Sequence, residues 1–307
     1  MGVVPEQWVT LFVSCAVAGV VALVVLRILL SRLRQFALDT PNHRSLHETP
    51  VPRTGGWALL GGTAAGLLVS GASISFGTFF AFFLLLSISL ADDLRPLSAR
   101  LRFSVQILSV CILLYEILPV PVGQGVWGTA WLLWPVLLLT GVWVVNLYNF
   151  MDGMDGFAGS MTAIGFAALA VISFWRGAAD LGSLCLLVVV SSVVFLHYNW
   201  PQAQIFLGDA GSTVIGLAVF AVSVVGWRQE VWGPLVPLLI FLPFWLDATA
   251  TLLIRIFRGE RWWEAHRQHL YQRMALKHGV KVSLRIELAV MVSTSLAALL
   301  LVKLGMA

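Results

Sequence analysis

Long apolar runs separated by short polar segments constrain this chain more than any other feature of its sequence. The first run, residues 8–30, is long enough to cross a bilayer as a helix. Only 11% of the 307 residues are charged and 59% are hydrophobic, whereas about a quarter of the residues of a soluble domain are charged. The sequence therefore predicts an all-α, polytopic membrane protein.

Ten apolar runs are interpreted as transmembrane helices. They are residues 8–30, 57–69, 76–90, 103–118, 131–145, 158–175, 181–196, 213–225, 234–257 and 286–304. Pro237 and Pro243 are expected to kink the ninth. No polar stretch is much longer than about 30 residues, so residues 1–307 are predicted to form a single integral-membrane domain.

The basic residues predict the orientation of these helices. No basic residue precedes the first run, which indicates a retained helix with its N-terminus outside the cell, not a cleaved signal peptide. Sixteen of the 19 Lys and Arg residues then lie in or beside three inner loops. This follows the positive-inside rule and places the polar motifs on the cytoplasmic side of the membrane. The net charge of +4 therefore reflects topology, and no nucleic-acid partner is expected.

A ladder of amides and carboxylates lies between the fifth and sixth runs. Asn146, Asn149, Asp152 and Asp155 follow one another at intervals of three residues. A carboxylate in the bilayer core is very costly, so these residues belong at a membrane surface or in a polar cavity. A polar loop explains the glycines that follow both aspartates but not the regular spacing. We therefore expect a functional site here.

Further carboxylates flank the third and eighth runs. Asp92 and Asp93 stand at the inner end of the third run, where one of them could bind Mg²⁺, which prefers carboxylate and phosphate oxygens. Alternatively, the pair is solvated, faces Arg95 or caps a helix. Asp209 lies in a Gly-Asp-Ala-Gly-Ser turn. It either caps the eighth helix or binds a ligand beside a helix start that favours phosphate.

The last inner segment carries a basic cluster. It comprises His266, Arg267, His269, Tyr271 and Arg273. Such a cluster suits a phosphate clamp made of charged hydrogen bonds. The alternative is an interfacial basic helix anchored by Trp262 and Trp263.

Two single residues and one segment also have alternative interpretations. Phe206 either stacks on a base or anchors its turn at the interface. Asp247, in the ninth run, is either functional or pairs with Arg255, two turns further on. Residues 35–54 are rich in Pro, His and Arg, and we expect a structured or ligand-contacting loop there.

Acidic residues from three inner loops and basic residues from two others indicate metal-assisted phosphoryl transfer at the inner face. The membrane location implies that at least one substrate is a lipid. The alternatives are a transporter or flippase of anionic lipids or ions, or another lipid phosphotransferase. A transporter more naturally places its polar groups at the midplane, often in two matching halves, and the sequence shows no such repeat.

Five sets of residues together match the motifs of one known family. They are Asp39…Pro41-Asn42…Arg44-Ser45…His47…Pro52-Arg53…Gly55-Gly56, Asp92-Asp93, Asn146…Asn149…Asp152-Gly…Asp155-Gly, Phe206…Gly208-Asp209…Gly211-Ser212 and Arg267…His269. With these motifs the chain resembles, over nearly its whole length, the polyprenyl-phosphate N-acetylaminosugar-1-phosphate transferases. This family includes the enzymes that start O-antigen synthesis and the phospho-MurNAc-pentapeptide translocase, and the resemblance implies a location in the bacterial inner membrane.

The resemblance implies a reaction and a set of site residues. Undecaprenyl phosphate would attack the β-phosphate of a UDP-N-acetylaminosugar, giving undecaprenyl-diphosphate-sugar and UMP, the initiating step of O-antigen, lipopolysaccharide or other cell-envelope glycan synthesis. The implied cofactor is Mg²⁺, with Mn²⁺ as an alternative, held by Asp209 and Asp92. The implied catalytic residues are Asp92, Asp93 and Asp209. The implied substrate-binding residues are Asn42, Arg44, His47, Arg53, Arg102, Asn146, Asn149, Asp152, Asp155, Phe206, His266, Arg267 and His269.

The sequence departs from the family pattern at two positions. Arg102 stands where many members carry Lys, which keeps the charge but changes the donor geometry. Tyr271 stands where many members have a second His, and with His266 it resembles the O-antigen subgroup that uses deoxy-amino sugars. The identity of the sugar, a monomer or a homodimer, and a one-step or covalent mechanism are left open by the sequence.

Overall fold

The computed structural model describes residues 6–41, 46, 49–118, 130–261 and 266–306, and nearly all of its regular structure is helical. This confirms the all-α class. The helices are α1 (Glu6–Arg32), α2 (Gly55–Ser70), α3 (Phe76–Leu94), α4 (Ala99–Ile117), α5 (Ala130–Phe150), α6 (Phe157–Trp175), α7 (Ala179–Asn199), α8 (Gly208–Arg228), α9 (Leu235–Ile240), α10 (Leu242–Phe257), α11 (Leu270–His278) and α12 (Val280–Lys303). Strands β1 (Leu38–Asp39) and β2 (Val51–Pro52) pair antiparallel within the segment expected to be a structured loop.

Seven of the described helices are long and apolar enough to cross a membrane, which confirms a polytopic membrane protein. They are α1, α3, α5, α6, α7, α8 and α12. The other predicted spans are helical too, but α2 has only 16 residues and the ninth run is broken into two helices. α4 carries Arg100, Arg102 and Glu116 within its 19 residues. The predicted count of ten spans is therefore not confirmed.

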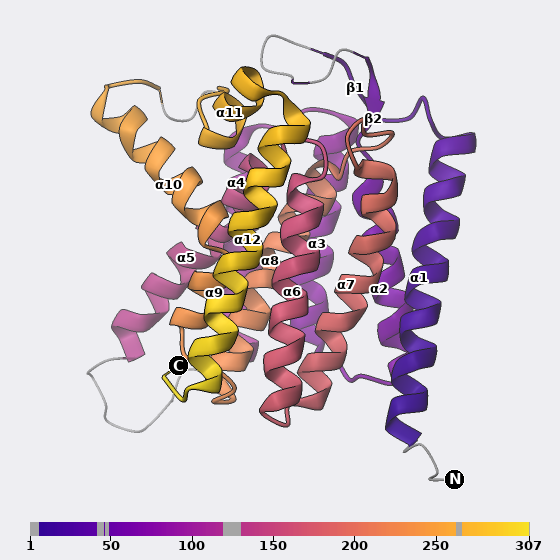
Figure 1. The fold of residues 1–307 in the computed structure, drawn as a ribbon, viewed down its shortest axis with the longest axis vertical. Coiled ribbons are helices and arrows are strands. Elements are labelled where there is room, and N and C mark those ends of the chain that lie inside the picture. Colours follow the sequence, from indigo (N-terminus) through magenta and orange to yellow (C-terminus); the bar gives the residue numbers. More distant parts are fainter. Residues whose placement is uncertain (1–5, 42–45, 47–48, 119–129, 262–265, 307) are drawn as a thin grey trace.

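The ninth run breaks as its prolines predict. α9 ends at Ile240, Phe241 follows, and α10 begins at Leu242 with Pro243 in its first turn. A proline has no backbone N–H and clashes with the carbonyl four residues earlier, so a continuous helix is disfavoured. Beyond the break, α10 leans away from the other helices (Figure 1).

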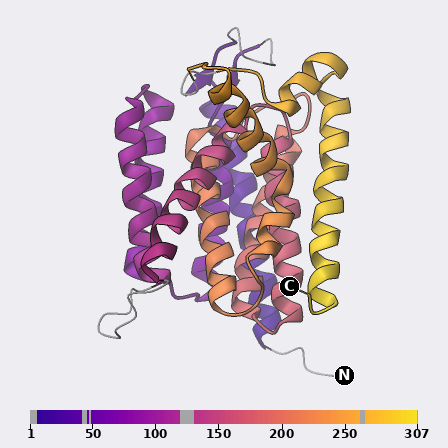
Figure 2. The ribbon, with the colours of Figure 1, turned by 90° about the vertical axis from the view of Figure 1, so that its left-hand side faces the viewer.

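The motif-bearing segments gather at one end of the helix bundle. Strands β1 and β2 and helix α11 lie at this end, whereas α1 begins and α12 ends at the opposite one (Figure 1). α8 is among the most buried of the membrane-length helices and packs against α2, α3 and α5. The α3–α4 pair and α12 lie on opposite sides of the bundle (Figure 2). α8 therefore carries its first turn into the centre of the motif end.

The segment before α8 is held by the start of α2. Phe206 N donates to Pro52 O at 2.8 Å, and Gly55 N donates to Phe206 O at 2.8 Å. Gly56 and Gly211 approach so closely that a Cβ on Gly56 would overlap the Cα of Gly211. Glycine permits this contact because it has no side chain. Residues far apart in the sequence are thus joined, and Arg53 is brought beside the start of α8.

Candidate active site

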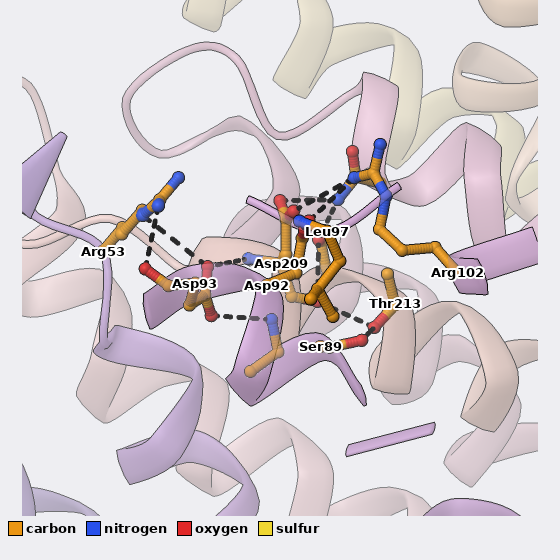
Figure 3. Close-up of polar contacts among 11 residues, drawn as sticks. Arg53, Ser89, Asp92, Asp93, Leu97, Arg102, Asp209 and Thr213 are labelled. Atoms are coloured by element: carbon orange, nitrogen blue, oxygen red, sulfur yellow. Dashed lines mark hydrogen bonds and ion pairs between the residues drawn. The ribbon is translucent and has the colours of Figure 1, made fainter. Parts of the chain in front are cut away.

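A buried carboxylate at the end of α3 holds the start of α8. Asp93 Oδ1 accepts a hydrogen bond from Asp209 N at 3.1 Å, and Oδ2 accepts one from Ala210 N at 3.0 Å. Arg53 supports it, because its Nη2 donates to Asp93 O at 2.8 Å and its Nε lies 3.7 Å from Oδ1 (Figure 3). A carboxylate satisfies the free N–H groups at a helix start and interacts well with the helix dipole. Asp93 therefore determines where Asp209 stands.

The neighbouring carboxylate, Asp92, faces Asp209 and Arg102. Asp92 Oδ2 accepts from Arg102 Nη1 at 2.8 Å, and the same nitrogen lies 3.7 Å from Asp209 Oδ2 (Figure 3). The carboxyl groups of Asp92 and Asp209 are close enough to share a hydrogen bond. Two adjacent carboxylates repel each other, and the one guanidinium beside them offsets only part of that repulsion. With one guanidinium between two acids, the cluster favours a further cation.

The polar ladder supplies two more contacts to the start of α8. Asn149 Nδ2 donates to Asp209 Oδ1 at 2.9 Å and lies 3.1 Å from Ser212 Oγ. Asp152, in the turn after α5, lies beside Gly208 and Asp209 at the start of α8. Burial, and then the charge of Asp209, raise the pKa of Asp152 well above that of an ordinary aspartate. Asn149 and Asp152 thus approach Asp209 from a third direction.

The outer members of the ladder contact other elements. Asn146 Nδ2 donates to Gln106 Oε1 at 2.8 Å, one helical turn deeper than Asn149 and between α4 and α5. Asp155 Oδ2 accepts from Ala203 N at 3.0 Å and so ties the turn after α5 to the segment that precedes α8. The four regularly spaced ladder residues therefore do not all make the same kind of contact. Asn149 and Asp152 reach the acidic cluster, whereas Asn146 and Asp155 support its surroundings.

The basic segment before α11 forms a separate group beside the end of α5. His269 is buried, its Nδ1 lies 3.4 Å from Asp247 Oδ1, and its ring stacks over Phe150 with a centroid distance of 6.3 Å. The His266 ring lies 4.8 Å from that of His269. Burial and the neighbouring His269 lower the pKa of His266 to about 4, so His266 is neutral at pH 7. Arg267 is exposed to solvent.

Comparison with known proteins places the chain in a family. Residues 75–227 match the model described as glycosyl transferase family 4. A decaprenyl-phosphate N-acetylglucosaminephosphotransferase of Mycobacterium tuberculosis is 32% identical, covering 81% of this chain and 70% of its own length. The chain belongs to the polyprenyl-phosphate aminosugar-1-phosphate transferases.

Other relatives carry names of the same kind. A probable undecaprenyl-phosphate N-acetylglucosaminyl 1-phosphate transferase of Bacillus subtilis is 28% identical, and the match covers 88% of this chain and 80% of the relative's length. An undecaprenyl-phosphate alpha-N-acetylglucosaminyl 1-phosphate transferase of Escherichia coli K12 is 25% identical, and the match covers 76% of this chain and 68% of the relative's length. The region matched by the family model contains all of the carboxylates around Asp209 and ends before α10 and α11.

The positions of the Asp92 and Asp209 carboxylates can be compared with the way Mg²⁺ usually binds to proteins. The Asp92 and Asp209 carboxylates lie next to each other at the motif end of the bundle, and the Asp209 side chain is 30% exposed. Among the described residues, no set of three or more His, Cys, Asp or Glu side chains is arranged to hold a metal unaided. Mg²⁺ commonly binds through one or two carboxylates plus waters and substrate phosphates. This pair therefore fits a metal that is completed by substrate.

The structure of the transferase brings seven of the sequence-predicted residues together. They are Arg53, Asp92, Asp93, Arg102, Asn149, Asp152 and Asp209. Phe206 lies at the start of the same segment and is half-buried. Asn42, Arg44 and His47 lie outside the described residues.

Asp247 requires a revised interpretation, because it does not pair with Arg255. Its oxygens accept from Leu270 N at 2.8 Å and Tyr271 N at 3.0 Å. Arg255 Nε donates instead to Glu260 Oε2 at 2.9 Å.

Sequence reasoning missed several supporting residues of the transferase. Ser89 Oγ lies 2.8 Å from Thr213 Oγ1 and joins α3 to α8 beneath the carboxylates (Figure 3). Asn199 accepts from Gly156 N at 3.0 Å and donates to Ile205 O at 2.9 Å. Serine, threonine and asparagine inside apolar runs are common, so no sequence signal distinguished these residues. Their role depends on the helix against which each one packs.

Proposed function

We propose that the transferase moves an N-acetylaminosugar 1-phosphate from a UDP-linked donor to undecaprenyl phosphate, which yields undecaprenyl-diphosphate-sugar and UMP. The observation that carries the proposal is the contact between the Asp92 and Asp209 carboxylates, with Arg102 against both, at the motif end of a membrane bundle. Phosphoryl transfer needs positive charge around the phosphates and an ordered approach of the two substrates. The relatives' names make UDP-N-acetylglucosamine the first donor to test. The biological context we propose is the start of O-antigen or other envelope glycan synthesis.

Each part of the cluster has a role in this proposal. Asp92 and Asp209 hold Mg²⁺, which when bound neutralises phosphate charge. Arg102 and Arg53 are only partly buried, with 42% and 31% of their side chains exposed, and they contact the phosphates of the two substrates. Phe206 stacks on the uracil ring. Asp93 keeps the first turn of α8 in place and does not act as a nucleophile, because both of its oxygens already accept backbone hydrogen bonds.

The proposed mechanism is a single displacement. A lipid phosphate oxygen forms the new bond to the β-phosphorus, and the bond from that phosphorus to the UMP oxygen breaks, so UMP leaves with the electron pair. The second pKa of a phosphate monoester is about 6, so the acceptor is already largely ionised at neutral pH and needs no general base. A covalent aspartyl intermediate would add a step without solving a further chemical problem.

We expect purified transferase to release UMP only when the lipid acceptor is present. The measurement uses UDP-N-acetylglucosamine labelled in the β-phosphate, Mg²⁺ and undecaprenyl phosphate in detergent micelles, and follows UMP and labelled lipid together. Chelation of Mg²⁺ should stop both. Omission of the lipid should leave no burst of UMP and no label on the protein. Release of one UMP per enzyme without lipid, lost in Asp92→Asn or Asp93→Asn, would refute direct attack and identify the nucleophile.

We also propose that the motif end faces the cytoplasm, since nucleotide sugars are cytosolic. In a variant without Cys15, Cys111 and Cys185, a cysteine placed at Ala99 or Ala203 should resist an impermeant thiol reagent added to intact cells. A cysteine at Ala72, in the exposed turn between α2 and α3 at the opposite end, should react. The reverse labelling pattern would place the site outside and would contradict the use of a cytosolic donor.

A further inference from the structure

A buried tyrosine in α11 contacts the turn that carries Asp152. Tyr271 has no solvent exposure, and its ring packs against Phe157 at 4.8 Å between centroids. Its Oη donates to Phe150 O at 2.9 Å and lies directly against Gly153, where a Cβ would overlap it. One hydroxyl therefore contacts both ends of the short stretch that contains Asp152.

The hydrogen bond to Phe150 satisfies a backbone carbonyl that has no helical partner, and the contact with Gly153 is one of close packing. Phe150 is the last residue of α5, where helix carbonyls lack the next turn to bond with. Gly153 follows Asp152, and a Cβ at this position would overlap Tyr271 Oη, so the fit requires glycine. Without the hydroxyl, the part-buried carbonyl of Phe150 would lose its partner, which is costly. The turn is thus shaped around the hydroxyl.

The position of Tyr271 is itself held from α10. The Asp247 carboxylate accepts from Leu270 N at 2.8 Å and from Tyr271 N at 3.0 Å, and its Oδ1 also accepts from Thr251 Oγ1 at 3.0 Å. A carboxylate with these contacts caps the start of α11. A continuous series of hydrogen bonds therefore runs from α10 through the start of α11 to the turn beside the acidic cluster.

We infer that Tyr271 is a positioning residue that holds Asp152 beside Asp209 by closing the turn between Phe150 and Gly153. Asp152 itself lies beside Gly208 and Asp209 at the start of α8. In this proposal Tyr271 contacts no substrate and acts through the turn. Its ring also stacks against His269 with a centroid distance of 5.8 Å, a contact that a phenylalanine would keep. The inference rests on the proposed function for its effect on the reaction, but its effect on the turn can be measured separately.

The first test measures the turn itself by hydrogen–deuterium exchange of the solubilised protein. In Tyr271→Phe, protection of the peptide that spans residues 150–156 should fall roughly fivefold, the usual effect of one lost buried hydrogen bond. Tyr148→Phe is the matched control. Tyr148 is equally buried, but its hydroxyl bonds Thr162 Oγ1 at 2.8 Å, away from the turn. Protection of 150–156 should be unchanged in this control.

The second test measures catalysis. Tyr271→Phe should lower kcat roughly tenfold to a hundredfold, the usual cost of removing a group that orients a functional side chain. In a double-mutant cycle with Asp152→Asn, the double variant should be no slower than Asp152→Asn alone, because both changes act through the same carboxylate. A residue that merely stabilises the fold would give additive losses of kcat in the cycle. Its replacement would also lower the unfolding temperature.

Each outcome decides the inference. Unchanged exchange over 150–156 in Tyr271→Phe overturns it. Faster exchange with wild-type kcat, or additive losses in the cycle, overturns the link to Asp152. If the wild-type protein itself releases no UMP from any UDP-sugar, the proposed function fails, and the exchange experiment still decides whether Tyr271 holds the turn.

Discussion

Replacing Asp209 by asparagine is expected to lower turnover about 10³-fold or more, which corresponds to about 4 kcal/mol of lost transition-state stabilisation. Asp209 is the carboxylate on which Asp92, Arg102 and Asn149 converge. The amide is isosteric and still accepts from Asn149, so the fold should persist. It carries no charge, however, and it is a weak ligand for Mg²⁺. The measurement is UMP release at saturating Mg²⁺ and both substrates, normalised to the amount of protein in the membrane.

Asp180→Asn provides the matched control for this change. Asp180 also lies in the first turn of a 21-residue membrane helix, α7, and is exposed at the end of the bundle opposite to the site. Its replacement should leave turnover within about twofold, as is usual for surface substitutions. Near-normal turnover of Asp209→Asn would contradict the proposed metal contact and would leave this residue only a structural role at the start of α8.

Gly208→Ala is expected to lower turnover roughly 10²-fold or more for a different reason, namely displacement of the site. Gly208 has a φ of +79°, and a Cβ there would overlap Arg53 O and lie 3.3 Å from Asp93 Oδ2. The added methyl group must separate the segment of Arg53 from the start of α8, which moves Asp209 away from its partners. A misplacement of about 1 Å can cost roughly 10²-fold in rate. The assay is again UMP release, combined with a thermal unfolding curve.

Gly177→Ala separates this displacement from ordinary backbone strain. Gly177 has a nearly equal φ of +77°, but a Cβ there meets nothing within 4 Å. Its replacement should therefore show only the cost of a left-handed alanine, about 1 kcal/mol, with turnover retained. Equal losses in the two variants would show that strain alone explains the effect and that the Arg53 contact has no special importance.

Sequence reasoning predicted the class and the general location of the site because both depend on local patterns. The apolar runs required membrane helices, and the polar ladder from Asn146 to Asp155 had to lie where one helix ends and another begins. The family motifs identified the acids that the structure gathers. The count of ten spans went beyond these patterns, because span length depends on how α2, α4 and the broken α9–α10 pair sit in the bundle.

The sequence by itself could not distinguish Asp92 from Asp93. Adjacent residues on a helix point about 100° apart, and only the packing of α3 against α8 decides which carboxylate meets which partner. Asp93 reaches backbone groups 116 and 117 positions away and fixes the start of α8, which leaves Asp92 to face Asp209 and Arg102. Tyr271 likewise meets Phe150 across 121 positions. The sequence by itself determined the membrane class and the acidic residues that form the candidate site. Which partner each of these acids contacts was decided by tertiary contacts that no local spacing encodes.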